Sequence, residues 1–284
     1  MIFKDYIRIS AIRMSFVFFL TSSCSMESSA EEENEATEAN DSSSESEEFV
    51  MGSIGDSITQ AMNSQNWGDN QQYNWSTGEN KDGLVYSHYK RMKEIIEGNI
   101  STYNSSVSGA KSDQLEDQAR EILDKDIDYL TILIGANDVC SWTGKYDKNI
   151  EEYKKNVENV VKIFIDNNPQ IKILIAPIPN LYNLWEVGNS KSCQFMWDIA
   201  QICSPLLHSS RTEDERLAFS ERTFKANDRL NEIANEYPNN VRYDPTLEDY
   251  EFEWEDVSPK DCFHPSIKGQ NLISELTWGT GWYR

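Results

Sequence analysis

Ser57 lies where an apolar segment of the chain gives way to a polar one. Residues 49–54 read FVMGSI, a short β-capable run, and Gly55-Asp56-Ser57-Ile58-Thr59 follows at once. A serine at the carboxyl end of a strand faces the crevice in which parallel sheets hold ligands. Because a serine hydroxyl is a weak nucleophile alone, nucleophilic catalysis also needs a base, a group that orients the base, and donors for an oxyanion. The duller interpretation is that Ser57 caps a helix.

The candidate base is His264, one of three histidines in the chain. Asp261 precedes it by three residues, so its carboxylate can reach the second ring nitrogen from the same loop, fix the tautomer and stabilise the imidazolium. His88 falls in a predicted helix and His208 in an insertion, and neither has an aspartate at comparable spacing. The alternative for Asp261 is that it only starts the last helix.

Five short apolar runs predict the strands that position these residues: 49–54, 100–107, 129–134, 171–177 and 241–243. The third and fourth are almost continuously apolar, as expected of strands covered on both faces. Amphipathic stretches predict helices over residues 85–97, 112–123, 149–167, 212–237 and 265–278. This alternation predicts an α/β fold, a three-layer α/β/α domain with a five-stranded parallel sheet and its ligand site at the carboxyl ends of the strands.

Two insertions interrupt the alternation, at residues 60–83 and 180–210. Both are rich in aromatic side chains and follow strands at the ligand-binding edge, so they are candidates to shape a pocket for an acyl group or a sugar. The alternative is that the aromatic residues only pack the loops onto the body. The aromatic residues are Trp67, Tyr73 and Trp75 in the first insertion and Tyr182, Trp185, Phe195 and Trp197 in the second. Met196 of the second insertion belongs to the same set of large apolar side chains.

Polar blocks also follow the second and third predicted strands, and one lies near the end of the chain. They read Ser108-Gly109-Ala110, Gly135-Ala136-Asn137-Asp138, and Asp261-Cys262-Phe263-His264-Pro265-Ser266. With the Ser57 motif, these blocks in this order resemble the SGNH subgroup of the GDSL hydrolase family, from residue 49 to about residue 278. The wording VSGAKS, ILIGANDVC and DCFHPS resembles its phospholipase B-like bacterial branch. Thr59 replaces the second glycine of G-x-S-x-G, which disfavours an α/β-hydrolase nucleophile elbow.

The resemblance implies a flavodoxin-like fold and a role for each site residue. Ser57 is implied as the nucleophile, His264 as the base that takes its proton, and Asp261 as the carboxylate behind the base. The oxyanion donors are implied to be the backbone N–H groups of Ser57 and Gly109 and the side-chain amide of Asn137. Asn137 has the alternative of stabilising a turn, and we interpret Asp56 and Asp138 as structural residues that bond backbone N–H groups.

The implied function is hydrolysis of carboxylic esters, of lipid or general acyl type, through an acyl-enzyme and without a metal or organic cofactor. A carbohydrate O-acetyl esterase is the alternative within the enzyme class, with Trp67, Tyr73 and Trp75 as a stacking platform. A non-catalytic surface lipoprotein that binds glycan or lipid is the alternative of another class. The sequence leaves the acyl length, the alcohol and the oligomeric state open.

Charge is unevenly distributed along the 284 residues, whose formal net charge is −22. Residues 25–48 contain ten acidic residues and no Lys or Arg, with almost no bulky apolar side chain, and predict a disordered acidic tether. Residues 49–284, the predicted hydrolase domain, carry 23 basic and 37 acidic residues, a net charge of −14. A surface of this sign repels phosphate backbones, so nucleic acid is excluded as a partner.

Residues 1–24 predict a targeting segment. A basic front (Lys4, Arg8, Arg13) precedes the short apolar run 14–20 and a small-residue site before Cys24. The arrangement resembles a bacterial lipoprotein signal, although Leu20 stands four positions before the cysteine instead of three. An ordinary secretory signal is the alternative. Either implies export, with membrane contact only through a lipid on Cys24.

Export makes disulfides the natural state of the remaining cysteines. Four of them allow two bridges in three connectivities, and the sequence does not choose among these: Cys140, Cys193, Cys203 and Cys262. Buried free thiols are the alternative. No pair has metal-site spacing with histidine, so zinc is disfavoured.

Overall fold

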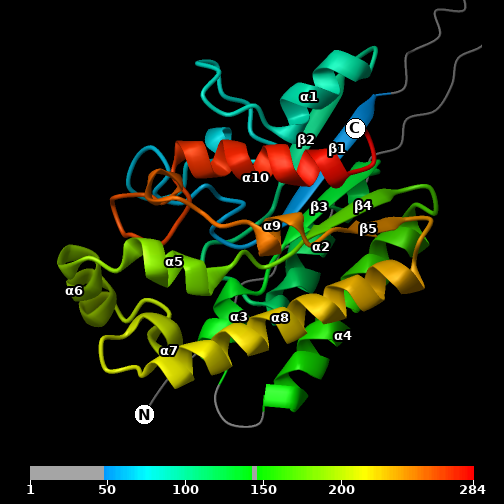
Figure 1. The fold of residues 1–284 in the computed structure, drawn as a ribbon. Helices are drawn as coiled ribbons and strands as arrows, with labels where there is room; N and C mark the ends of the chain where they lie inside the picture. The colour runs from blue at the N-terminus through cyan, green and yellow to red at the C-terminus, as the bar shows by residue number, and fades with distance from the viewer. Residues whose placement is uncertain (1–47, 143–145) are drawn as a thin grey trace, which may run out of the picture. The chain divides into compact units, whose positions relative to one another are not determined.

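The fold is centred on a five-stranded parallel sheet, as predicted (Figure 1). A computed structural model describes residues 48–142 and 146–284 of the chain. The strand order is β2-β1-β3-β4-β5, and every neighbouring pair is parallel. The strands are β1 Phe49–Gly55, β2 Ile100–Asn104, β3 Tyr129–Leu133, β4 Lys172–Ala176 and β5 Val241–Tyr243. The predicted signal segment and the tether, except Glu48, lie outside the described residues.

The sheet is buried on both faces, because its strands alternate side chains between two apolar clusters. In β3, Leu130 and Ile132 belong to the cluster that contains residues of α2 (Leu115–Ile122), α4 (Tyr146–Asn167) and α8 (Glu213–Glu236). Tyr129 and Leu133 belong to the cluster with residues of α1 (His88–Ile95) and α10 (Ile267–Thr280). All five β3 residues are buried. Helices therefore cover both faces and the sheet forms the middle layer of three (Figure 1).

The predicted helices are present, with ends set by local capping. α8 begins after Thr212, whose side chain accepts a hydrogen bond from Glu215 N in a capping box. α1 and α10 begin two or three residues later than predicted, because Ser87 and Ser266 are their N-caps. The bounds are α1 His88–Ile95, α2 Leu115–Ile122, α3 Ala136–Ser141, α4 Tyr146–Asn167, α5 Leu181–Gly188, α6 Lys191–Ala200, α7 Ser204–Leu207, α8 Glu213–Glu236, α9 Thr246–Asp249 and α10 Ile267–Thr280, with 3₁₀ segments at Gln71–Tyr73, Ser112–Gln114, Leu123–Lys125 and Trp254–Asp256.

The second insertion folds into three helices, α5, α6 and α7, which the sequence did not predict. Two disulfides attach it to the body: Cys203 precedes α7 and bridges to Cys140 in α3, and Cys193 in α6 bridges to Cys262. Two disulfides are typical of a protein that folds in an oxidising compartment outside the cytosol. Across residues 48–142 and 146–284, no helix has the length and apolar character that crossing a bilayer requires.

The aromatic residues of the insertions divide between packing and exposure. Trp75 and Trp197 are fully buried, so for them the packing interpretation is correct. Trp75 cannot belong to the predicted stacking platform for a sugar, because its ring is buried and its indole N–H donates to Thr59 Oγ1 at 3.3 Å inside the core. Trp67 and Phe195 are 72% and 67% exposed, which leaves their rings in solvent.

Candidate active site

Ser57 is presented at the carboxyl end of β1 by a sharp change of backbone direction. Gly55 has φ +148°, and a Cβ there would lie 2.1 Å from Leu133 O, so only glycine fits beside β3. The Asp56 carboxylate accepts a hydrogen bond from Ile58 N at 2.9 Å, and the backbone carbonyl of Asp56 accepts one from Thr59 N at 3.1 Å. These two bonds close the turn. The turn leaves the backbone N–H of Ser57 without an acceptor among the described residues.

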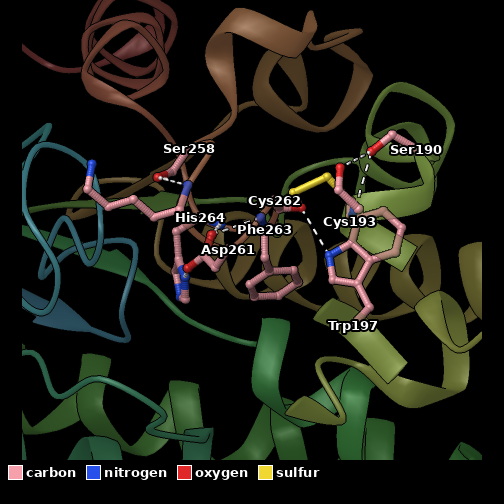
Figure 2. The surroundings of a disulfide bond; sticks show 10 residues. Ser190, Cys193, Trp197, Ser258, Asp261, Cys262, Phe263 and His264 are labelled. Atoms are coloured by element: carbon pink, nitrogen blue, oxygen red, sulfur yellow. Dashed lines mark hydrogen bonds and ion pairs between the residues drawn. A yellow bond between two sulfur atoms is a disulfide. The ribbon is translucent and has the colours of Figure 1, made fainter. Parts of the chain in front are cut away.

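His264 comes from the opposite end of the chain, on a loop held by its own backbone (Figure 2). Ser258 N donates to His264 O at 2.7 Å, and Cys262 N donates to Ser258 O at 2.9 Å. Asp261 Oδ1 accepts the backbone N–H groups of Phe263 at 2.9 Å and His264 at 3.0 Å. These bonds curl the loop so that the carboxylate and the imidazole lie on the same side.

The structure brings the predicted serine, histidine and aspartate into one chain of hydrogen bonds. His264 Nε2 lies 2.8 Å from Ser57 Oγ, and His264 Nδ1 lies 2.6 Å from Asp261 Oδ2. Burial favours a raised pKa for Asp261, but the hydrogen bond and charge of His264 outweigh it and, with further donors, lower the pKa to about 2. An ionised Asp261 requires the proton on Nδ1, which leaves Nε2 as the acceptor for the serine hydroxyl.

The predicted oxyanion donors lie on three neighbouring segments. Asn137 shares a pocket wall with Ser57 and His264, and its amide donates to Ala110 O at 3.0 Å. Gly109, next to Ala110, has φ +84° and an N–H without an acceptor among the described residues. A Cβ on Gly109 would meet no atom within 4 Å, so glycine is required there by the backbone conformation. Gly109 is not part of the pocket wall.

The pocket beside Ser57 is small and largely apolar. Its cavity volume is about 40 Å³, room for roughly three water-sized groups. The second insertion contributes Asn180, Leu181 and Leu184 to the wall, as predicted for that insertion, whereas the aromatic residues of the two insertions do not line it. Besides Ser57, Asn137 and His264, the wall includes Leu181, Leu184, Phe252, Val257, Phe263 and Pro265.

Two buried carboxyl groups support the turns around the site. Burial raises the pKa of Asp56 to about 7, even though Ile58 N bonds its carboxylate. Burial likewise raises the pKa of Asp138 to about 6, although two hydrogen bonds from Ser112 act to lower it. The Asp138 carboxylate accepts these bonds from Ser112 N at 3.0 Å and from Ser112 Oγ at 2.7 Å. Both aspartates bond backbone N–H groups, as predicted, but Asp138 bonds a distant segment instead of its own turn.

Two further contacts support Asp261, and the sequence assigned neither of them. Asn63 Nδ2 donates to Asp261 Oδ2 at 2.5 Å. On the other side, Cys262 is bridged to Cys193, and Trp197 Nε1 donates to Cys262 O at 3.2 Å (Figure 2). A signal for the bridge is present in the sequence, since Cys262 directly follows Asp261, whereas Asn63 lies in a polar stretch without any periodic pattern.

Comparison with known proteins places this arrangement in a family. Residues 52–277 match the family described as GDSL-like Lipase/Acylhydrolase, so the chain belongs to that family. Phospholipase B1, membrane-associated, of Mus musculus is 26% identical over 160 residues, which cover 48% of this chain but only 11% of the mouse protein.

Solved structures share the fold at low sequence identity. TesA superposes with a TM-score of 0.51 at 16% identity, covering 81% of this chain and 97% of TesA. The lipase Lip_vut3 from a goat rumen metagenome gives 0.51 at 13% identity, covering 83% of this chain and 100% of the lipase. The predicted SGNH hydrolase fold is thereby confirmed.

Proposed function

We propose that this chain is a serine esterase that hydrolyses carboxylic esters through an acyl-enzyme on Ser57. The observation that carries the proposal is the continuous hydrogen-bond chain from Ser57 Oγ through His264 to Asp261, with separations of 2.8 and 2.6 Å. These separations are those of a nucleophile joined to its base and of a base joined to its orienting carboxylate.

In the first half-reaction, Ser57 Oγ attacks the ester carbonyl carbon while its proton passes to His264 Nε2. The resulting imidazolium is stabilised by the ionised Asp261 at Nδ1. The tetrahedral intermediate expels the alcohol, which takes the proton from Nε2, and the acyl group stays on Oγ. Water then repeats the sequence against the acyl-enzyme, giving the carboxylic acid and restoring Ser57.

The negative charge of the intermediate needs donors on the substrate oxygen. The N–H groups of Ser57 and Gly109 are free of acceptors among the described residues, which supports their assignment. The Asn137 amide has two N–H bonds and uses one on Ala110 O, so the other is available. Loss of one such donor costs on the order of 10²–10³ in rate in a known serine hydrolase.

The small apolar pocket supports an acyl group of a few carbons and thus a general acyl esterase. The same pocket is compatible with acetyl, so a carbohydrate O-acetyl esterase is the second candidate. A series of p-nitrophenyl esters from acetate to decanoate separates lipid-type activity, which favours long chains, from the short-chain activity that this pocket supports. Acetylated polysaccharide against p-nitrophenyl acetate then separates the two short-chain candidates.

The proposal is tested with Ser57→Ala, which removes only one oxygen atom. We expect its turnover of p-nitrophenyl acetate to fall by at least about 10³-fold without a change in the unfolding transition. Full retention of activity would reject the mechanism. A fluorophosphonate probe labels an activated serine, so an unlabelled wild-type protein would favour the non-catalytic binding protein instead.

For location, we propose that the protein is exported and anchored to a membrane by a lipid on Cys24. The two disulfides support export, and the signal-like order of residues 1–24 supports lipid attachment. Metabolic labelling with a clickable fatty acid should mark the wild type and not Cys24→Ser. Equal labelling of both would contradict the anchor.

A further inference from the structure

We propose that Asn63 is a positioning residue for catalysis, whose side-chain amide holds the Asp261 carboxylate in the orientation that serves His264. The inference rests on the proposed function, since it assigns a partner to one member of the proposed triad. Asn63 Nδ2 lies 2.5 Å from Asp261 Oδ2, the same oxygen that lies 2.6 Å from His264 Nδ1.

Asn63 completes the set of donors around Asp261. Oδ1 accepts two backbone N–H groups, and Oδ2 accepts one donor from the histidine and one from Asn63. Asp261 is 6% exposed, so few water molecules could replace a lost donor. A carboxylate with four fixed donors has one orientation, and this orientation directs Oδ2 at the imidazole.

The direction of the Asn63 amide is fixed by its neighbours. Oδ1 accepts Gly68 N at 2.8 Å, while Nδ2 faces the carboxylate. In a flipped amide, the NH₂ group of Asn63 would face the N–H of Gly68, and its oxygen would face Asp261 Oδ2. Neither contact could form a hydrogen bond, so only the observed direction satisfies both neighbours. The amide therefore presents a donor, and not an acceptor, to Asp261.

The backbone of Asn63 is built to keep that amide in place. Its φ of +57° lies in the left-handed region, which asparagine tolerates better than most residues. Its N–H donates to Gly68 O at 2.8 Å, and its carbonyl accepts Ser258 Oγ at 2.7 Å. Ser258 in turn donates its N–H to His264 O, so Asn63 joins the loop after Ser57 to the loop that carries the histidine.

Two substitutions separate the donor from the fold of the loop. Asn63→Gly suits the left-handed backbone and removes the amide, whereas Asn63→Asp keeps an acceptor for Gly68 N and replaces the donor by a like charge. Asn70→Asp is the matched control: it is 3% exposed in the same loop, its Nδ2 bonds Asn66 O and Gly68 O, and it has no bond to Asp261.

We expect kcat for p-nitrophenyl acetate to fall about 10- to 100-fold in Asn63→Gly, with KM nearly unchanged, because a hydrogen bond to a charged group is lost. Asn63→Asp should lose more near neutral pH, and the ratio of its kcat to that of the wild type should rise on acidification, when the new carboxyl is protonated and donates. His264, the titratable group that interacts with Asp261, and Asp56, whose charge interacts with His264, are the same in every variant.

The NMR resonance of the proton on His264 Nδ1 distinguishes a positioning role of Asn63 from a merely structural one, because only a positioning role predicts that it shifts. This far-downfield resonance should shift in Asn63→Asp and stay in place in Asn70→Asp. Equal kcat losses in Asn63→Asp and Asn70→Asp, or an unmoved resonance in Asn63→Asp, would overturn the positioning role even if Asn63→Gly failed to fold. An active Ser57→Ala would instead overturn the proposed function, so the two failures are distinguishable.

Discussion

Asp261→Asn is the change whose effect the geometry defines most closely. Asparagine keeps the shape of the side chain, and its oxygen can still accept the backbone N–H groups of Phe263 and His264. Its NH₂ group then replaces Oδ2, which faces two donors, His264 Nδ1 at 2.6 Å and Asn63 Nδ2 at 2.5 Å. The histidine relieves the clash by moving its proton to Nε2, where it can no longer accept the serine proton.

The wrong tautomer should lower kcat by about 10³–10⁴, since the same exchange in a well-studied serine protease costs about 10⁴. A lowered pKa also contributes to stability: a fall from 3.8 to about 2 at a buried group corresponds to about 2 kcal/mol. Because the folded-state pKa is lowered, this contribution is complete above the unfolded pKa and is lost as the pH falls through the folded value.

Steady-state hydrolysis of p-nitrophenyl acetate at mildly alkaline pH measures the first effect, and urea unfolding near neutrality and near pH 2 measures the second. The stability difference between wild type and Asp261→Asn should be larger near neutrality than near pH 2. A variant with the kcat of the wild type would refute the role of Asp261. A stability difference that does not change with pH would refute the reasoning about its charge.

Two further predictions concern the disulfides and the pocket. The bridges Cys193–Cys262 and Cys140–Cys203 span 69 and 63 residues, so replacing either pair by serine should cost a similar stability, about 4 kcal/mol in the chain-entropy account. Only loss of Cys193–Cys262 should lower kcat in the folded protein, because Cys262 adjoins Asp261; equal kcat in both double variants would contradict this. Phe252→Ala enlarges the pocket, because Phe252 is part of its wall. The substitution should shift the preference of the enzyme toward longer acyl chains in a series of p-nitrophenyl esters. An unchanged preference would place the acyl group elsewhere.

The sheet could be predicted because strands that are buried on both faces have apolar residues at nearly every position. The runs around Tyr129–Leu133 and Lys172–Ala176 are apolar at nearly every position, and the polar residues that follow parallel strands must meet at one edge. The pairing of Ser57 with His264, 207 residues apart, was implied instead by the resemblance of the sequence blocks to the SGNH subgroup. Their exact separation depends on side-chain packing, which no strand pattern encodes.

The rest could not be predicted because it depends on contacts between segments without periodicity. Asn63 acts through an unusual φ and one amide bond to a residue 198 positions away. Trp75 and Trp67 lie in one polar stretch, yet only Trp75 is buried, since its indole N–H finds Thr59 Oγ1 in the core. The disulfide pairing follows from the fold of the second insertion, which the sequence did not reveal.

In the proposed mechanism, Ser57 carries the acyl group during turnover. Rapid acid quench of the reaction with a slowly deacylated ester, followed by peptide mass spectrometry, measures this directly. We expect the mass of the acyl group on the peptide that contains Ser57, and we expect this adduct to form quickly in the wild type and slowly in His264→Ala. Continued hydrolysis with no acyl group on Ser57, or with the acyl group on another residue, would contradict it.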